Sequence, residues 1–232
     1  PIITIDDQSL EVDKPKTDLS WDVILIRVND VWKQAGESTN QTLRKKHGLQ
    51  GPIDDAFMDR FLMVGPSSWP MNSTVGDWVS DEMSHAMRHW RQQFRGKPRF
   101  KMDHEVTEQD IRESHLVLWG DPSSNTLIRK IVKQLPIKWD HQGIHTPQKK
   151  YTPDRYLPAL IYPNPLNPEK YVVINSGFTY REYDYLNNAR QVPKLPDWAI
   201  LDLSQPPTSR WPAGITNAGF FGENWEWLPP VE

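Results

Sequence analysis

The chain has 232 residues, of which 27 are Lys or Arg and 30 are Asp or Glu, so its formal net charge is −3. This near-neutral balance argues against a dedicated nucleic-acid-binding protein, which usually presents a strongly basic face. Apolar runs reach only about four residues, far short of the roughly 20 that a membrane-spanning helix needs, and the lack of Cys excludes disulfides, thiolate metal sites and a Cys nucleophile.

The first part of the chain, residues 1–35, predicts two short β-hairpins. Apolar and polar residues alternate on both sides of two turns that contain Asp or Asn, at residues 6–8 and 29–30. The polar stretch that follows is typical of a connector. We therefore expect a small β module with its connector at residues 1–50 and one larger domain at residues 51–232.

After Pro52 the pattern changes to strands that alternate with helices. Short apolar runs predict strands, and apolar residues spaced three or four positions apart predict helices, the longest of them over residues 75–94. We also expect a hairpin-like insertion at residues 136–156 and an irregular, aromatic-rich tail after Pro206. The expected strands lie at residues 61–64, 99–102, 116–119, 160–162, 171–174 and 198–201, and the other expected helices at 107–111, 127–135 and 180–186.

The alternation of strands and helices predicts an α/β fold. We expect a three-layer sandwich with a mostly parallel sheet of the Rossmann or flavodoxin type, preceded by the small β-hairpin module. In open sheets of this kind, ligands bind at the carboxyl ends of the strands. The loops that follow the strands are therefore the first place to look for a site.

The most site-like stretch follows the strand expected at residues 116–119. Asp121, Ser123, Ser124 and Asn125 lie between this strand and an expected helix. Backbone N–H groups at the start of a helix, together with these polar side chains, would hold an anion or a polar oxygen. We therefore take the four residues as the candidate ligand-binding site. The alternative interpretation is that Asp121, Ser123 or Ser124 only caps the helix.

No catalytic residue can be assigned from the residues themselves. An α/β-hydrolase places its nucleophile in a Gly-x-Ser-x-Gly turn after a strand, and the chain has no such pentapeptide. Glu82, His85 and His89 share one helical face, where we expect a solvated surface rather than a metal site. Asp54 and Asp55 could bind a cation or act as acid and base, and a role in a turn is the other interpretation.

Aromatic residues near the end of the chain allow two interpretations. They could form a platform on which sugars stack, or they could pack a Pro-rich segment against the sheet. The residues concerned are Tyr180, Tyr183, Tyr185, Trp225 and Trp227.

Four longer motifs resemble a known group of proteins. They are HGLQGPIDDAF at residues 47–57, LWGDPSSN at 118–125, IYPNPLNP at 161–168 and NARQVPKLPDWA at 188–199. Together they resemble the C-terminal region of large bacterial proteins, common in planctomycete-like genomes, that are classed as prolyl-oligopeptidase-like α/β-hydrolases. The resemblance spans nearly the whole chain, as far as Phe221.

The resemblance implies that the catalytic Ser, acid and His lie upstream, in a hydrolase domain, and no residue of this chain matches one of them. It implies a non-catalytic domain of an exported serine hydrolase, periplasmic or extracellular, that is either a peptidase or an esterase. Such a domain would shape substrate access or stabilise the catalytic domain. The expected partner is that catalytic α/β-hydrolase domain, and no nucleic acid, membrane span, metal or cofactor is expected.

Two other functions stay open. The first is an independent carbohydrate-binding module that uses residues 121–125 and the exposed aromatic residues. The second is a metal-assisted hydrolase built on Asp54, Asp55 and the histidines.

Overall fold

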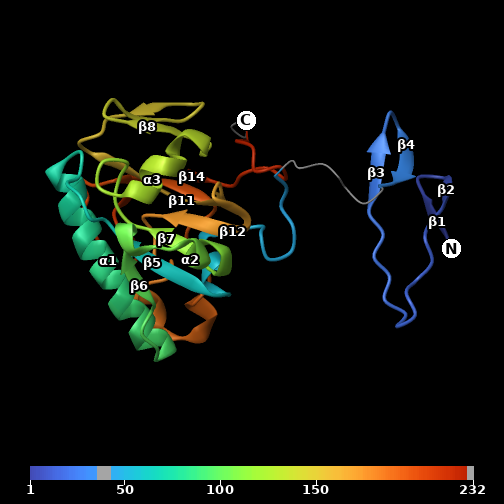
Figure 1. The fold of residues 1–232 in the computed structure, drawn as a ribbon, viewed down its shortest axis with the longest axis horizontal. Helices are drawn as coiled ribbons and strands as arrows, with labels where there is room; N and C mark the ends of the chain where they lie inside the picture. The colour runs from blue at the N-terminus through green and yellow to red at the C-terminus, as the bar shows by residue number, and fades with distance from the viewer. Residues whose placement is uncertain (36–42, 229–232) are drawn as a thin grey trace. The chain divides into compact units, whose positions relative to one another are not determined.

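The structure is a computed structural model that describes residues 1–35 and 43–228. The chain divides into two compact units, Pro1–Thr42 and Leu43–Glu232 (Figure 1). The observed boundary thus lies a few residues before the division expected at residue 50. The larger unit holds the main sheet and the long helix.

The N-terminal unit consists of two hairpins, as the sequence predicts. The central residues of both turns have positive φ, between 48° and 62°, which is the geometry that short hairpin turns favour and which suits Asp and Asn. The Gln8 side chain links the hairpins, because it donates to the carbonyl of Asp30 (2.8 Å) and accepts the N–H of Trp32 (2.9 Å). The strands are β1 (Ile2–Ile5), β2 (Gln8–Glu11), β3 (Leu25–Val28) and β4 (Val31–Gln34).

The larger unit is built on a seven-stranded mixed sheet (Figure 1). The strand order is β14-β13-β11-β12-β7-β5-β6. Strands β12, β7, β5 and β6 are parallel, whereas β11, β13 and β14 run antiparallel to their neighbours. The strands are β5 (Phe61–Gly65), β6 (Phe100–Met102), β7 (His115–Leu118), β11 (Tyr156–Asn164), β12 (Asn167–Ile174), β13 (Trp198–Asp202) and β14 (Gly214–Gly219).

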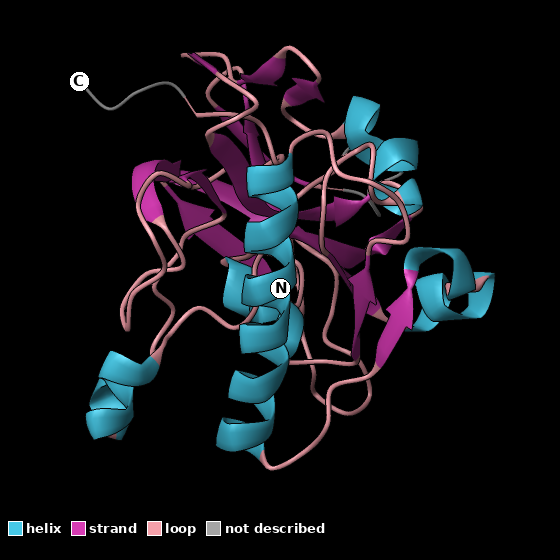
Figure 2. Ribbon diagram, turned by 90° about the vertical axis from the view of Figure 1, so that its left-hand side faces the viewer, coloured by secondary structure: helices cyan, strands magenta, loops and turns pink. Residues whose placement is uncertain are grey.

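Three α-helices accompany this sheet among the described residues: α1 (Ser73–Phe94), α2 (Glu108–Glu113) and α3 (Thr126–Ile131). Figure 2 shows α1 as the longest helix, lying across the sheet. The insertion after α3 forms a small sheet of β8 (Lys138–Asp140), β9 (Gly143–His145) and β10 (Lys150–Tyr151). Short 3-10 helices complete the unit: η1 (Ile53–Phe57), η2 (Asp103–Glu105), η3 (Val132–Gln134), η4 (Glu182–Leu186) and η5 (Asn188–Arg190).

The expected three-layer sandwich with a mostly parallel, Rossmann- or flavodoxin-like sheet is wrong. Strands make up 31% and helices 24% of the structure, and three of the seven sheet strands are antiparallel to their neighbours. The cause lies at the turn between β11 and β12, where the Asn164 side chain accepts the N–H of Leu166 (3.0 Å) and β12 runs back along β11. A strand buried on both faces reads as an apolar run in either direction, so the pattern does not reveal strand direction.

A second difference lies in the tail after Pro206, which we expected to be irregular. Within this tail, β14 forms an edge strand that pairs antiparallel with β13. The connections from β12 to β13 and from β13 to β14 contain no α-helix, and all their residues are described. Strands β13 and β14 are antiparallel neighbours, which need no crossover helix, and the connection that crosses from β12 past β11 to β13 carries only the 3-10 helices η4 and η5. This half of the sheet therefore lacks the outer α-helical layers that the prediction required.

Aromatic side chains fix the end of the chain to the sheet. Trp225 is only 1% exposed. Its ring packs edge-to-face against Tyr162 of β11 and Tyr171 of β12, with ring centroids 5.7 and 6.0 Å apart. Burial of a ring this large contributes strongly to stability. The tail is therefore part of the core of the larger unit.

Candidate functional site

The loops after the parallel strands β5, β7 and β12 lie at one edge of the sheet, and Asn175 connects the loop after β12 to the loop after β7. Asn175 directly follows β12 and is 1% exposed. Its Oδ1 accepts the N–H of Gly120 (2.9 Å), and its Nδ2 donates to the carbonyls of Gly120 (2.8 Å) and Pro158 (3.4 Å). Its φ of 51° lies in the left-handed region, which Asn tolerates better than most residues. The ends of β7, β11 and β12 are thus held together by one side chain.

The Asp121 carboxylate shapes the loop between β7 and α3. Its Oδ1 accepts the N–H groups of Ser123 (2.8 Å) and Ser124 (2.9 Å). Its Oδ2 accepts the N–H of Met71 (2.8 Å), which belongs to the loop after β5. Hydrogen bonds to an ionised acceptor are stronger than neutral ones. Asp121 therefore fixes its own loop and joins it to the neighbouring one.

Asn125 is the N-cap of α3. Its Oδ1 accepts the N–H groups of Leu127 (3.0 Å) and Ile128 (3.3 Å), which have no partner within the helix. Its Nδ2 donates to the carbonyl of Trp119 (2.9 Å), at the end of β7. The side chain is fully buried, so all of its polar atoms are used for local structure.

Ser124 has a similar role. Its hydroxyl accepts the N–H of Asp121 (2.9 Å), and its carbonyl accepts the N–H of Ser68 (3.0 Å) in the loop after β5. Three of the four candidate side chains, those of Asp121, Ser124 and Asn125, are therefore engaged within the loops. The helix is thus capped by Asn125, which the capping interpretation did not name, whereas Asp121 and Ser124 stabilise the loop before the helix.

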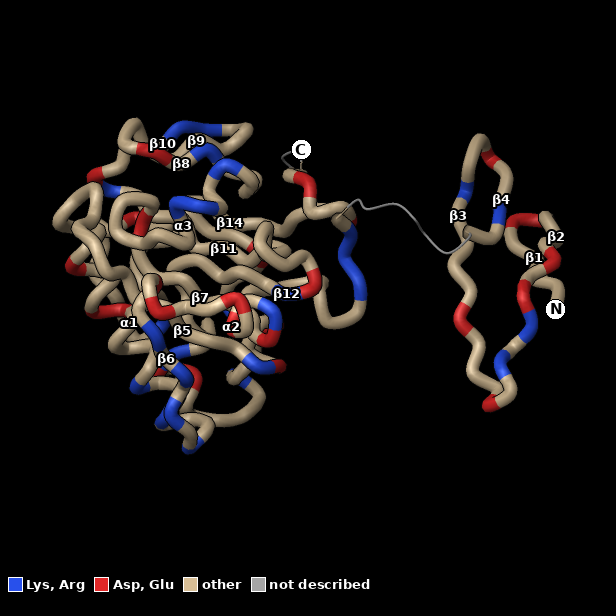
Figure 3. Tube along the Cα trace, viewed as in Figure 1, with Lys and Arg blue, Asp and Glu red and all other residues tan. Residues whose placement is uncertain are grey.

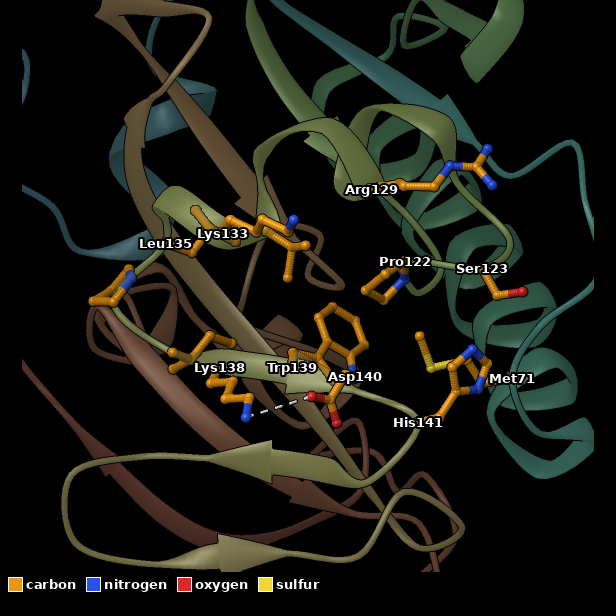
Figure 4. Close-up of a pocket in the computed structure, with 13 residues that line it drawn as sticks. Met71, Pro122, Ser123, Arg129, Lys133, Leu135, Lys138, Trp139, Asp140 and His141 are labelled. Atoms are coloured by element: carbon orange, nitrogen blue, oxygen red, sulfur yellow. Dashed lines mark ion pairs between the residues drawn. The ribbon is translucent and has the colours of Figure 1, made fainter.

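Ser123 lies beside a hollow at the surface of the larger unit. It is half-buried and lines a hollow of about 840 Å³ between its loop, α3 and β8 (Figure 4). Figure 4 shows the Trp139 ring directed toward Pro122 across this hollow. Most of the lining is apolar and comes from Val132, Leu135, Pro136, Ile137 and Trp139.

Positive charge gathers at the same hollow. Arg129 and Lys133 are exposed, lie four residues apart and make no ion pair within the described part of the chain. Lys138 lies 3.9 Å from the Asp140 carboxylate. An apolar lining with a few cations suits a ligand that has an apolar body and an acidic group. This hollow was not predicted from the sequence, because its residues were expected to form the end of a helix and an insertion. The four-residue spacing of Arg129 and Lys133 was the available signal.

A second cavity, of about 450 Å³, lies between the loop after β5 and the start of α1. Trp69 stands at this cavity and is 88% exposed. Hydroxyl groups of Ser68, Ser73 and Ser80 contribute polar lining, and the Ser124 residue of the candidate loop lines it as well. The loop between β7 and α3 thus contributes to two hollows.

Asp54 and Asp55 point to different partners. Asp54 is buried and accepts the N–H of Thr179 (2.7 Å) and the hydroxyl of the same residue. Burial raises the pKa of Asp54 to about 6, against the effect of these hydrogen bonds. Asp55 instead accepts the hydroxyl of Tyr171. The two carboxylates therefore connect η1 to separate parts of the unit, which agrees with the structural interpretation of this pair.

We expected one face of α1 to be exposed to solvent, and this prediction is wrong. The face carries Glu82, His85 and His89. Glu82 is 6% and His89 2% exposed. The reason is η4, which packs on this face and brings ionic and aromatic partners that are distant in sequence. These contacts are Arg181 donating to Glu82, Glu182 Oε1 lying 2.6 Å from His85 Nε2, and the Tyr185 hydroxyl hydrogen-bonding His89 Nδ1.

The proposed sugar-stacking platform is not assembled from the residues expected. Trp225 and Tyr180 are buried, at 1% and 4% exposure, whereas Tyr183 is 37% exposed. The packing interpretation therefore describes Trp225 and Tyr180. Within residues 1–35 and 43–228, no group of three or more His, Asp or Glu residues is placed to hold a metal ion.

Comparisons with known proteins add no family to this geometry: no family model, no curated protein and no solved structure matches the chain. None of the helices in the described part of the chain has the length and apolar character needed to cross a membrane. What the site does must therefore be argued from its residues.

We expect Asp121→Asn to lower the free energy of unfolding by about 2–3 kcal/mol, because it leaves buried N–H groups without a charged acceptor. Urea denaturation measures the change. Ser123→Ala, in the same loop, is the matched control and should stay within about 0.5 kcal/mol of the wild type. Equal stability of the two variants would contradict the assignment of Asp121 as the residue that fixes the loop.

The stability of the chain should fall as the pH is lowered from about 6.5 to 4. Burial lowers the pKa of His89 and of His115 to about 4, so in this range the unfolded chain binds protons that the folded chain does not. Asp54, whose pKa is raised, opposes part of this loss below about pH 6. Urea denaturation at several pH values measures the slope.

His89→Gln should make that slope shallower, because it removes one of the two groups whose lowered pKa produces it. A His89→Gln variant with the wild-type slope would show that this residue is protonated in the folded chain.

Proposed function

We propose that the chain is a non-catalytic C-terminal domain of an exported serine hydrolase, either a peptidase or an esterase. In this role it shapes substrate access to, or stabilises, a catalytic α/β-hydrolase domain that carries the reacting residues. The proposal starts from the resemblance of four sequence motifs, and the arrangement of those motifs in the structure supports it.

The observation that carries the proposal is that the motif residues are engaged in structural contacts. Tyr171 donates its hydroxyl to Asp55 and accepts the N–H of Gly51 (2.9 Å), so the motif at residues 47–57 is anchored to β12. Asp197, in the motif at residues 188–199, pairs with Lys45 at 2.6 Å. Residues used in this way maintain the fold and are not free to react with a substrate.

The loop between β7 and α3 supports the same conclusion. A hydrolase nucleophile needs an accessible Ser hydroxyl that is hydrogen-bonded to a His. Ser124 is 2% exposed and its hydroxyl accepts the N–H of Asp121. The His side chains that form hydrogen bonds in this unit contact other groups: His85 contacts Glu182, His89 contacts Tyr185, and His115 accepts the N–H of Tyr171 (2.8 Å).

We expect no covalent labelling of the full chain by a fluorophosphonate probe and no hydrolysis of p-nitrophenyl esters, because no Ser hydroxyl within residues 1–35 and 43–228 is hydrogen-bonded to a His. Labelling is measured by mass spectrometry of the intact chain. Labelling that disappears in Ser123→Ala or Ser124→Ala would overturn the proposal, since it would place a reactive nucleophile in this loop.

The gene sequence provides a second, independent test of the proposed link to a serine hydrolase. Sequencing upstream of the Pro1 codon should reveal an open reading frame that encodes a Gly-x-Ser-x-Gly motif followed by an acid and a His. A start codon or a signal peptide directly before Pro1 would contradict the link to a hydrolase and leave a separate binding protein.

A carbohydrate-binding module is the second candidate, and one observation favours it. Trp69, at 88% exposure, stands at the 450 Å³ cavity whose lining includes several Ser hydroxyls. An exposed aromatic ring provides an apolar face for a sugar, and hydroxyls can bind its polar edge. This site replaces the one expected at Trp225.

Glycan-array binding that is lost in Trp69→Ala would support the carbohydrate-binding function. We expect a loss of about five- to twelvefold, because stacking on an aromatic ring contributes about 1–1.5 kcal/mol. Trp211→Ala is the control, since Trp211 is 40% exposed and does not line this cavity. Absence of any glycan binding by the wild type would remove this candidate.

A further inference from the structure

One segment of the larger unit is strongly basic in an otherwise slightly acidic chain. Residues 83–102 contain six Lys or Arg residues and no Asp or Glu, whereas the whole chain has a net charge of −3. Figure 3 shows this charge gathered at the lower end of α1 and beside β6. The cations are Arg88, Arg91, Arg95, Lys97, Arg99 and Lys101.

Helix geometry brings three of these cations to one surface. Arg88, Arg91 and Arg95 are spaced three and four residues apart, which places them on one face of α1 and its C-terminal end. Lys97 and Arg99 follow directly, in the connection to β6. All five are exposed. They therefore form a continuous charged surface, here called the basic ridge.

The five cations of the basic ridge are not neutralised by the fold. Within the described ranges of the chain none of them makes an ion pair, whereas the neighbouring Lys101 lies 2.6 Å from Asp110. The helix dipole favours cations in the last turn of a helix, which accounts for Arg91 and Arg95. It does not account for Lys97 and Arg99, which lie beyond the end of α1. Like charges on one surface repel each other, and a bound anion relieves that repulsion.

Two aromatic side chains are interleaved with these cations. Phe94, at the last position of α1, is 44% exposed, and Phe100, at the first position of β6, is 40% exposed. Phe94 is supported from behind by Phe178, with ring centroids 5.3 Å apart. A surface that combines exposed Phe with flanking Arg and Lys is the composition of segments that lie in the interface of a lipid bilayer.

We propose that the basic ridge, together with Phe94 and Phe100, binds an anionic lipid surface. The cations are attracted to the acidic headgroups, and the two rings enter the boundary between headgroups and acyl chains. A lipid surface offers many acidic headgroups, so the cations do not need individually positioned acidic partners. No residue of the basic ridge lines either of the two hollows described above, so the ridge is a separate surface. Four of the five cations are Arg, whose planar guanidinium binds phosphate in a bidentate manner.

Sedimentation of the full chain with large vesicles tests the proposal. We expect the chain to sediment with vesicles of phosphatidylcholine and phosphatidylglycerol, to stay in solution with vesicles of phosphatidylcholine alone, and to be released as NaCl screens the charges. The variant Arg88→Gln, Arg91→Gln, Lys97→Gln should bind on the order of 100-fold more weakly, because each cation near an acidic surface contributes about fivefold.

The matched control removes the same number of charges elsewhere. Lys130, Lys149 and Lys150 are exposed and belong to α3 and the small sheet, at the other end of the unit in Figure 3. Their replacement by Gln should leave binding within about threefold of the wild type, since they lie away from the ridge. Phe100→Ser should weaken binding while leaving its salt dependence unchanged, because it removes apolar contact only.

Three results would overturn the proposal: equal binding to neutral vesicles, equal loss in the two charge variants, or no binding of the wild type to acidic vesicles. If the wild type does not bind acidic vesicles but binds poly-L-glutamate, and the ridge variant loses that binding, the basic ridge recognises an acidic protein surface instead. Circular dichroism of every variant separates loss of binding from loss of fold.

Discussion

The larger unit depends on the hydrogen bonds of Asn175, which lies where the parallel half of the sheet meets the antiparallel half. Its amide joins Gly120 after β7 to Pro158 in β11 from a position at the end of β12. From this fixed point the loop continues to Asp121, which binds three backbone N–H groups, and to Asn125, which caps α3. These groups are buried, so each would carry a desolvation cost if its partner were lost. The network therefore holds the strand ends, the loops and a helix in one arrangement.

Two buried ion pairs join distant segments of this unit, whereas other cations stay unpaired at its surface. Arg181 pairs with Glu82, and Lys45 pairs with the fully buried Asp197, which links segments far apart in the chain. An isolated charge in such positions would cost several kcal/mol, as continuum estimates and mutational data indicate. The basic ridge and the cations of the hollow at Ser123 are different, because they are exposed and have no acidic partner within the described residues. The interior is thus built for stability, and the recognition that we propose uses the exterior.

Local sequence patterns predicted most helices, strands and turns, but they did not predict which distant segments pack against each other. The hairpin turns at Asp6 and Asn29 and the long helix α1 follow from turn chemistry and apolar spacing, and the structure contains all of them. Strand β14 was missed because its sequence, GITNAG, has little apolar content, and its antiparallel pairing with β13 is a long-range contact. The buried face at Glu82 was missed for a related reason: η4, about a hundred residues later, covers it.

In the candidate site, too, some features follow from the local sequence and others from contacts between distant segments. The sequence by itself determined that Asp121, Ser124 and Asn125 lie between a strand and a helix, because residue type and apolar spacing are local properties. It also determined the absence of a Gly-x-Ser-x-Gly turn and the cluster of cations at residues 83–102. Only the tertiary structure decided that β12 turns back along β11, that Asn175 reaches Gly120, and that Ser123 faces a hollow. The physical reason is that backbone hydrogen bonds and burial depend on which distant segments meet, and a local pattern does not contain that information.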